Sequence, residues 1–205
     1  MTAVIDYDAG NIRSVEKALL ALGEEVLVTR DKEAILSAER IILPGVGAFG
    51  DAMGRLHNYG LVDVIRQAAV ENIPFLGICL GLQLLFERSE ESGRVQGLGI
   101  LKGEILRIPD HADVKVPHIG WNSIALTNSG RLFKGVPEHS YVYFVHSYFL
   151  RAAEEEIVTA STVYGTQIHA SVEKGNIFAC QFHPEKSSRV GLKILKNFIS
   201  IQRKD

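Results

Sequence analysis

The sequence is poor in cysteine and has no long apolar run. Two cysteines among 205 residues, Cys79 and Cys180, are too few for a disulfide scaffold. The longest uncharged apolar stretch, residues 73–86, is shorter than the roughly 20 residues of a membrane span, so no transmembrane helix is expected. Asp6 and Asp8 lie where a secretory signal would carry basic and apolar residues. The sequence therefore predicts a cytoplasmic protein with free thiols.

An excess of basic charge is also missing. The chain has 22 Lys and Arg against 24 Asp and Glu, and no dense basic run, so it lacks the electrostatic footprint of a nucleic-acid or membrane binder. The seven histidines are not spaced as metal ligands, and there is no phosphate-loop motif. The sequence therefore predicts that the protein uses neither a metal nor another cofactor. With 46% hydrophobic residues, the chain is expected to fold as one domain over residues 1–205, whose partners are small molecules or proteins.

The first half alternates strand-like runs with helical patterns. Strands are expected at residues 3–5, 25–28, 40–43 and 75–78. Helices are expected at residues 12–22, which follow Asn11 as N-cap, and around 31–38, 49–56 and 61–70. This alternation predicts a parallel sheet with helices on both faces.

The second half is rich in β patterns. Strands are expected at residues 99–108, 141–148, 157–163, 167–172 and 177–182, and an amphipathic helix at 187–201 closes the chain. Gly175 and Asn176 tolerate positive φ, so residues 173–176 predict a hairpin turn. The predicted fold class is a single α/β domain with a mixed, mostly parallel central sheet flanked by helices and additional antiparallel strands in the second half.

The clearest chemical motif is Gly77-Ile78-Cys79-Leu80-Gly81, where a buried-strand pattern runs into a helical one. This arrangement is typical of a nucleophile elbow, because glycines on both sides of a strained residue remove crowding β-carbons. A cysteine at the start of a helix is favoured as thiolate, and the N–H groups there can stabilise an oxyanion. The alternative is a buried cysteine that acts only as a small hydrophobe.

A base for this nucleophile is offered by His183-Pro184-Glu185. Proline disfavours helical geometry at His183, so an extended segment is expected in which His183 and Glu185 point to the same side and the carboxylate orients the imidazole. The alternative is a surface histidine beside a solvated glutamate. The same alternation places Cys180 on the opposite, core-facing side.

Residues 45–50 match Gly-x-Gly-x-x-Gly but lack the context of a dinucleotide site, because the motif does not follow the first strand and Asp63 lies in a helical pattern. The preferred interpretation is a loop over residues 44–47 whose N–H groups face a reacting carbonyl. A simple tight turn is the alternative.

Taken together, these motifs resemble those of the class I, triad-type glutamine amidotransferases, and within them the glutaminase subunits that serve an imidazole glycerol phosphate cyclase. The resemblance rests on six blocks that span nearly the whole chain, at residues 6–11, 43–49, 77–86, 118–122, 144–148 and 181–187. One departure is Asp8, where the family's opening motif is expected to have glycine; it should affect a turn and not the chemistry.

The resemblance implies a role for each matched position. The catalytic residues would be Cys79, His183 and Glu185. The oxyanion would be held by backbone N–H groups of Val46, Gly47 and Leu80. Glutamine would be bound by Gly47, Gln83, Glu91, Ser147 and Tyr148, and the partner would contact Asn11 and Trp121. For Asn11 and Trp121, a helix cap and a core aromatic are equally compatible with the sequence.

The implied reaction is hydrolysis of L-glutamine through a glutamyl thioester. Ammonia freed into water would be protonated and lost, and one glutaminase domain leaves no room for an acceptor site. The resemblance therefore implies a heterodimer with a (β/α)8-barrel cyclase subunit, which makes imidazole glycerol phosphate and an aminoimidazole carboxamide ribonucleotide in histidine biosynthesis. Three alternatives are the glutaminase of another synthase (pyridoxal phosphate, anthranilate or guanylate), a free-standing cysteine hydrolase, and a non-enzymatic ligand-binding module.

Overall fold

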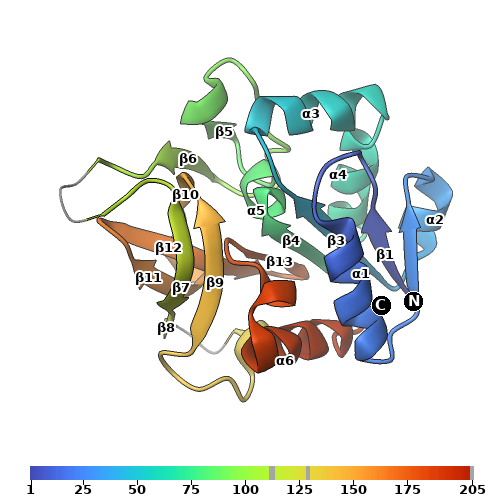
Figure 1. Ribbon diagram of the computed structural model, residues 1–205. Coiled ribbons are helices and arrows are strands. Elements are labelled where there is room, and N and C mark those ends of the chain that lie inside the picture. The colour runs from blue at the N-terminus through green and yellow to red at the C-terminus, as the bar shows by residue number, and fades with distance from the viewer. Residues whose placement is uncertain (111–113, 128–129, 204–205) are drawn as a thin grey trace.

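In the computed structural model, which describes residues 1–110, 114–127 and 130–203, the central sheet begins with five parallel strands. They are β1 (Thr2–Ile5), β2 (Val26–Thr29), β3 (Arg40–Gly45), β4 (Phe75–Cys79) and β13 (Ile177–Cys180). Their spatial order is β2-β1-β3-β4-β13 (Figure 1). The parallel core expected from the first half of the sequence is confirmed.

The sheet continues beyond β13 with strands from the second half of the chain. They are β12 (Gln167–Lys174), β10 (Tyr148–Ala152), β6 (Gly103–Arg107), β5 (Arg88–Ser89), β11 (Val158–Val163) and β8 (Ala125–Leu126). β12 pairs antiparallel with β13, β10 and β11. The β12–β13 hairpin turns at Gly175, which has φ +59°, as its sequence predicted.

Helices cover both faces of the parallel core. They are α1 (Ile12–Ala21), α2 (Lys32–Ser37), α3 (Phe49–Asn58), α4 (Val62–Val70), α5 (Leu80–Leu84) and α6 (Ser188–Ile199). Side chains alternate along β3, so that Ile41 and Leu43 join the core formed with α2, α3 and α4, while Ile42 joins the core formed with α1 and α6. The predicted α/β class is confirmed.

Two strand predictions in the second half were wrong in detail. Residues 99–108 form a strand only at β6, and residues 141–148 form two strands that separate at Ser147. The first of these, β9 (Tyr141–His146), pairs with β7 (His118–Ser123), which the sequence analysis missed, in a separate two-stranded sheet. Within the described ranges, none of the helices is long and apolar enough to cross a membrane.

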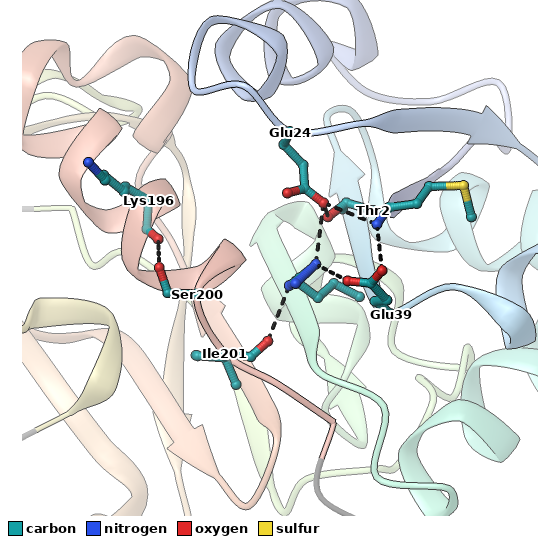
Figure 2. A network of polar contacts seen from close by, with 8 residues as sticks. Thr2, Glu24, Glu39, Lys196, Ser200 and Ile201 are labelled. Atoms are coloured by element: carbon teal, nitrogen blue, oxygen red, sulfur yellow. Dashed lines mark hydrogen bonds and ion pairs between the residues drawn. The ribbon is translucent and has the colours of Figure 1, made fainter.

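The two chain ends lie close together and are joined by Arg40 at the start of β3 (Figure 1). Its guanidinium donates to the carbonyl of Ile201 at 3.1 Å and pairs with Glu24 at 3.3 Å and Glu39 at 2.9 Å (Figure 2). The N-terminal ammonium of Met1 pairs with the same two carboxylates. This network fastens the segment after α6 to the parallel core.

We predict that Arg40→Met lowers the free energy of unfolding by about 1–2 kcal/mol, because the carbonyl of Ile201 loses its side-chain donor and the 13% exposed carboxylate of Glu24 loses one of its cationic partners. Urea unfolding monitored by circular dichroism measures the change. Arg94→Met, at an exposed arginine, is the control and should change the free energy by less than about 0.5 kcal/mol. Equal stability of the two variants would contradict the prediction.

Candidate active site

The site lies where β3, β4 and β13 end at one edge of the sheet. The register aligns Gly45 of β3 with Cys79 of β4, and Ile78 with Cys180 of β13, so the segments that leave these strands meet there. A cavity of about 330 Å³ opens at this edge. It is lined by Val46, Gly47, Cys79, Leu80, Gln83, Glu91, Pro117, Val145, His146, Ser147 and Tyr148.

Cys79 has the strained backbone expected of a nucleophile elbow. Its φ of +55° and ψ of −109° lie in a region that side chains rarely adopt, and α5 begins at the next residue. A β-carbon at Gly77 would lie 2.6 Å from the carbonyl oxygen of Gly81, and one at Gly81 would collide with the carbonyl of Leu43. Both glycines are thus required for the turn, as the sequence analysis predicted.

His183 and Glu185 form a buried pair. Nδ1 of His183 lies 2.8 Å from Oε1 of Glu185, and the side chains are 2% and 1% exposed. The extended geometry predicted for the whole segment holds at His183 only, because Pro184–Lys186 forms a short 3₁₀ turn (η4) that still brings the carboxylate back to the imidazole. The surface location considered as an alternative is excluded by this burial.

The electrostatic environment of His183 favours its charged form. Burial lowers the pKa of the imidazole, but the interactions of the ring with Cys79 and with the carboxylate of Glu185 outweigh burial and raise it to about 10. Nε2 of His183 is buried and has no hydrogen-bond partner among the described residues, although Cys79 is near enough to act on the pKa of the ring. The ring therefore presents Nδ1 to Glu185 and leaves Nε2 free of hydrogen bonds to the described residues.

The glycine-rich loop is shorter than predicted. Pro44 and Gly45 belong to β3, and residues 46–48 form the connection to α3. Val46 is 42% exposed and Gly47 has φ +99°, a conformation that favours glycine. Together with Leu80, the first residue of α5, these residues line the cavity beside Cys79, where their N–H groups are candidates for an oxyanion site.

The five positions predicted to bind a small amide line the cavity together, although they come from four separate segments. The amide nitrogen of Gln83 donates to the carbonyl of Tyr148 at 3.0 Å. Glu91 lies in the 3₁₀ turn η1 (Glu90–Ser92) and accepts the N–H of Phe49 at 2.7 Å, which ties the cavity wall to the start of α3. Their roles in binding stay predictions.

The structure adds residues that sequence reasoning did not assign to the site. Pro117, Val145 and His146 line the cavity, and the buried amide of Gln181 contacts the sulphur of Cys79 at 3.7 Å. Gln181 and His146 stand within the sequence blocks at residues 181–187 and 144–148. Strand alternation placed Gln181 on the same face as His183, but no role was assigned to it, and nothing in the spacing marked His146.

His146 and His118 form a buried pair next to the cavity. Nε2 of His146 lies 3.0 Å from Nδ1 of His118, and Nδ1 of His146 lies 2.9 Å from the carbonyl of Tyr148. Burial lowers the pKa of His146 to about 3 and that of His118 to about 4. Both rings are therefore neutral at pH 7, in contrast to His183.

Three further predicted residues are placed by the structure. Cys180 is fully buried in the core, as expected, and burial raises the pKa of its thiol. Asn11 precedes α1, but its side chain accepts a hydrogen bond from the hydroxyl of Ser14 and bonds no helix N–H. Trp121 is 51% exposed, so the alternative of a core aromatic is wrong. Within the described ranges, no group of three His, Cys, Asp or Glu is arranged to hold a metal ion.

Comparison with known proteins places this geometry in context. The profile of the family described as "Glutamine amidotransferase class-I" matches residues 3–201. The chain is 54% identical over 201 residues to a protein of Moorella thermoacetica named imidazole glycerol phosphate synthase subunit HisH, covering 98% of this chain and 95% of the relative. It is 52% identical to the Aquifex aeolicus protein of the same name, covering 96% and 95%.

Solved structures agree on the fold. A crystal structure titled as a glutamine amidotransferase superimposes with a TM-score of 0.75 at 21% identity, covering 97% of both chains. A chain of the PurLQS structure from Thermotoga maritima superimposes with a TM-score of 0.74 at 22% identity, again covering 97% of both. At such identities these likenesses concern the fold alone.

The neutral histidine pair predicts acid sensitivity. Below a pH of about 6.5 the unfolded chain binds protons at these positions while the folded rings stay neutral down to about pH 4 and 3, so the free energy of unfolding falls as pH drops. Between about pH 7 and 5, His146 accounts for a loss of about 2 kcal/mol. The variant His146→Asn keeps a donor near the Tyr148 carbonyl. Between about pH 7 and 5, its free energy of unfolding, measured with urea, should fall by about 2 kcal/mol less than that of the unmodified chain.

The control for this experiment is His139→Asn, because the His139 side chain is 73% exposed. It should show the same acid-induced loss as the unmodified chain. A His146→Asn variant with an unchanged loss would show that the pair is not the source of acid sensitivity.

Proposed function

Because this chain belongs to the class I glutamine amidotransferase family, we propose that its residues 1–205 form one glutaminase domain that hydrolyses L-glutamine and passes the ammonia to a cyclase subunit of imidazole glycerol phosphate synthase. The observation that carries the proposal is the strained Cys79 on the wall of the cavity, next to the buried His183–Glu185 pair. A nucleophile, a base and a carboxylate that orients the base are the parts that acyl transfer requires.

The charged form of His183 holds on Nε2 the proton that Cys79 gives up, and in the first step the sulphur attacks the side-chain amide carbon of glutamine as a thiolate. The carbonyl oxygen becomes an oxyanion, for which the N–H groups of Leu80 and of the Val46–Gly47 loop are the proposed donors. His183 then protonates the amide nitrogen as the carbon–nitrogen bond breaks. Ammonia leaves, and a glutamyl thioester remains on Cys79.

In the second step, water attacks the thioester while His183 accepts its proton, the carbon–sulphur bond breaks, and glutamate leaves. The sulphur of Cys79 and the protonated His183 are thereby regenerated. Glu185 orients His183 and stabilises the imidazolium in both steps. The substrate is held by the residues that share the cavity with Cys79, namely Gly47, Gln83, Glu91, Ser147 and Tyr148.

A partner subunit is part of the proposal, because the ammonia needs an acceptor and is protonated in water. The relatives of Moorella thermoacetica and Aquifex aeolicus carry the name of a synthase subunit. Trp121, which is 51% exposed, and Asn11 at the start of α1 are the proposed contacts of a heterodimer. We place the pair in the cytoplasm, where reducing conditions keep Cys79 a thiol.

Two other functions use the same triad: the glutaminase of another synthase and a free-standing cysteine hydrolase. Identities of 54% and 52% over nearly the full chain to synthase subunits of one name favour the imidazole glycerol phosphate assignment. A free-standing hydrolase would be fully active without a partner, and a ligand-binding module would not need Cys79. In the proposed pathway the cyclase uses the ammonia to form imidazole glycerol phosphate and an aminoimidazole carboxamide ribonucleotide for histidine biosynthesis.

We predict that glutamate release by the purified chain is slow alone and strongly stimulated by the cyclase subunit with its ribonucleotide substrate. Cys79→Ala should lower this release by at least about 10³-fold, because no nucleophile remains. Its free energy of unfolding should change by about 1 kcal/mol or less, since only one small atom is lost. An enzyme-coupled glutamate assay and urea unfolding measure the two effects.

The outcomes separate the candidate functions. Full glutamate release by the chain alone would favour a free-standing hydrolase. No glutamate release by the complex would indicate another synthase partner. Near-normal turnover by a folded Cys79→Ala variant would overturn the triad assignment.

Glu185→Gln is expected to be milder, with a loss of about 10²-fold in kcat. The amide oxygen can still accept the N–H of His183 Nδ1, but the charge that stabilises the imidazolium is gone. Steady-state kinetics of the complex measure the change. A loss as large as that of Cys79→Ala would argue against a purely supporting role of Glu185.

A further inference from the structure

The carbonyl oxygen of Tyr148 joins two buried hydrogen-bond chains. It lies 2.9 Å from Nδ1 of His146 and accepts the side-chain amide nitrogen of Gln83 at 3.0 Å. A carbonyl oxygen has two lone pairs and cannot donate. Both neighbours must therefore donate to it, which fixes the direction of every further hydrogen bond in the two chains.

On the histidine side, His146 carries its proton on Nδ1, so its Nε2 accepts. His118 then donates from Nδ1 across the 3.0 Å contact. Because burial keeps both rings neutral, this direction cannot be reversed by protonation at pH 7. The pair thus holds the Tyr148 carbonyl in place as an acceptor.

On the glutamine side, the second N–H of Gln83 donates to Oε1 of Gln181 at 3.0 Å. The amide of Gln181 therefore has its oxygen toward Gln83 and its nitrogen toward Cys79, whose sulphur lies 3.7 Å away. Gln181 is fully buried, so water offers no competing partner. A flip of either amide would place nitrogen against nitrogen or oxygen against the Tyr148 carbonyl.

The environment of Cys79 gives this N–H a chemical role. Cys79 is 6% exposed, and its sulphur also lies 3.9 Å from the backbone carbonyl of Val145, which can only accept and so suits the protonated thiol. The N–H of Gln181 suits the thiolate, because hydrogen bonds to ionised acceptors are about twice as strong as neutral ones. The two contacts thus favour opposite protonation states of the nucleophile.

We propose that Gln181 is a further catalytic residue, whose side-chain N–H donates to the sulphur of Cys79 and favours the reactive thiolate, with Gln83 and the Tyr148 carbonyl fixing its direction. The inference rests on the proposed function, because it concerns the same nucleophile. As the thiol proton moves to Nε2 of His183, the N–H of Gln181 stays on its nitrogen and shortens its contact with the sulphur.

Alkylation of Cys79 by iodoacetamide tests the proposal without relying on glutamine turnover. The rate is followed on the full chain by mass spectrometry of the Cys79 peptide. Gln181→Met keeps a similar volume but removes the donor, and it should slow alkylation at about pH 7 by about five- to tenfold. The deficit should vanish at about pH 10, where thiols ionise without assistance.

Gln181→Glu, which has the same shape but places a carboxylate beside the sulphur, should be slower than Gln181→Met. Gln67→Met, at an exposed glutamine of α4, is the matched control and should alkylate at the unmodified rate. Circular dichroism confirms that each variant is folded. Equal alkylation rates at about pH 7 for the folded Gln181 variants and the control would overturn the proposal.

Glutamate release measured on the same variants separates the two claims. Slower alkylation in a chain that never releases glutamate, even with the cyclase, would retain the role of Gln181 and overturn the proposed function. Normal alkylation of the Gln181 variants in an active glutaminase would overturn the role of Gln181 alone.

Discussion

The turn between β4 and α5 is the constraint on which the site depends. Cys79 can hold its positive φ only because the helix that follows packs directly on the neighbouring strand, with Gly81 against the carbonyl of Leu43. This packing leaves no room for a β-carbon and fixes the sulphur at the edge where β3 and β13 also end. The surrounding core stabilises this strained backbone and so holds the proposed nucleophile in a fixed position, around which the rest of the site is arranged.

Three buried histidines near Cys79 differ in their charge state. His183 has the carboxylate of Glu185 on Nδ1 and Cys79 nearby, and the interactions with both favour its charged form despite burial. His118 and His146 have no such neighbours and remain neutral. A charged ring suits proton transfer during amide cleavage, whereas neutral rings keep fixed donors and acceptors and so preserve the direction of a buried network.

The small sheet formed by β7 and β9 connects the site with the surface. His118 and His146 stand opposite each other in its register, and Trp121, three residues after His118, is exposed. β9 ends at His146, and Ser147 and Tyr148 then form part of the cavity wall. The pairing of β7 with β9 therefore joins the surface proposed for the partner to the residues proposed to hold the substrate.

The sequence by itself determined the α/β class, the elbow and the His183–Glu185 pair, because these follow from local rules: alternation of patterns, glycines beside a strained residue, and the limits that proline sets on its neighbour. It did not determine β7, the break at Ser147 or the contact of Gln181 with Cys79. These three features depend on residues that are far apart in the chain. The sequence around a glutamine does not show whether its side chain faces water or another buried group. Only the tertiary structure, by placing Gln181 between one donor, the amide N–H of Gln83, and one sulphur, decided which way its amide points.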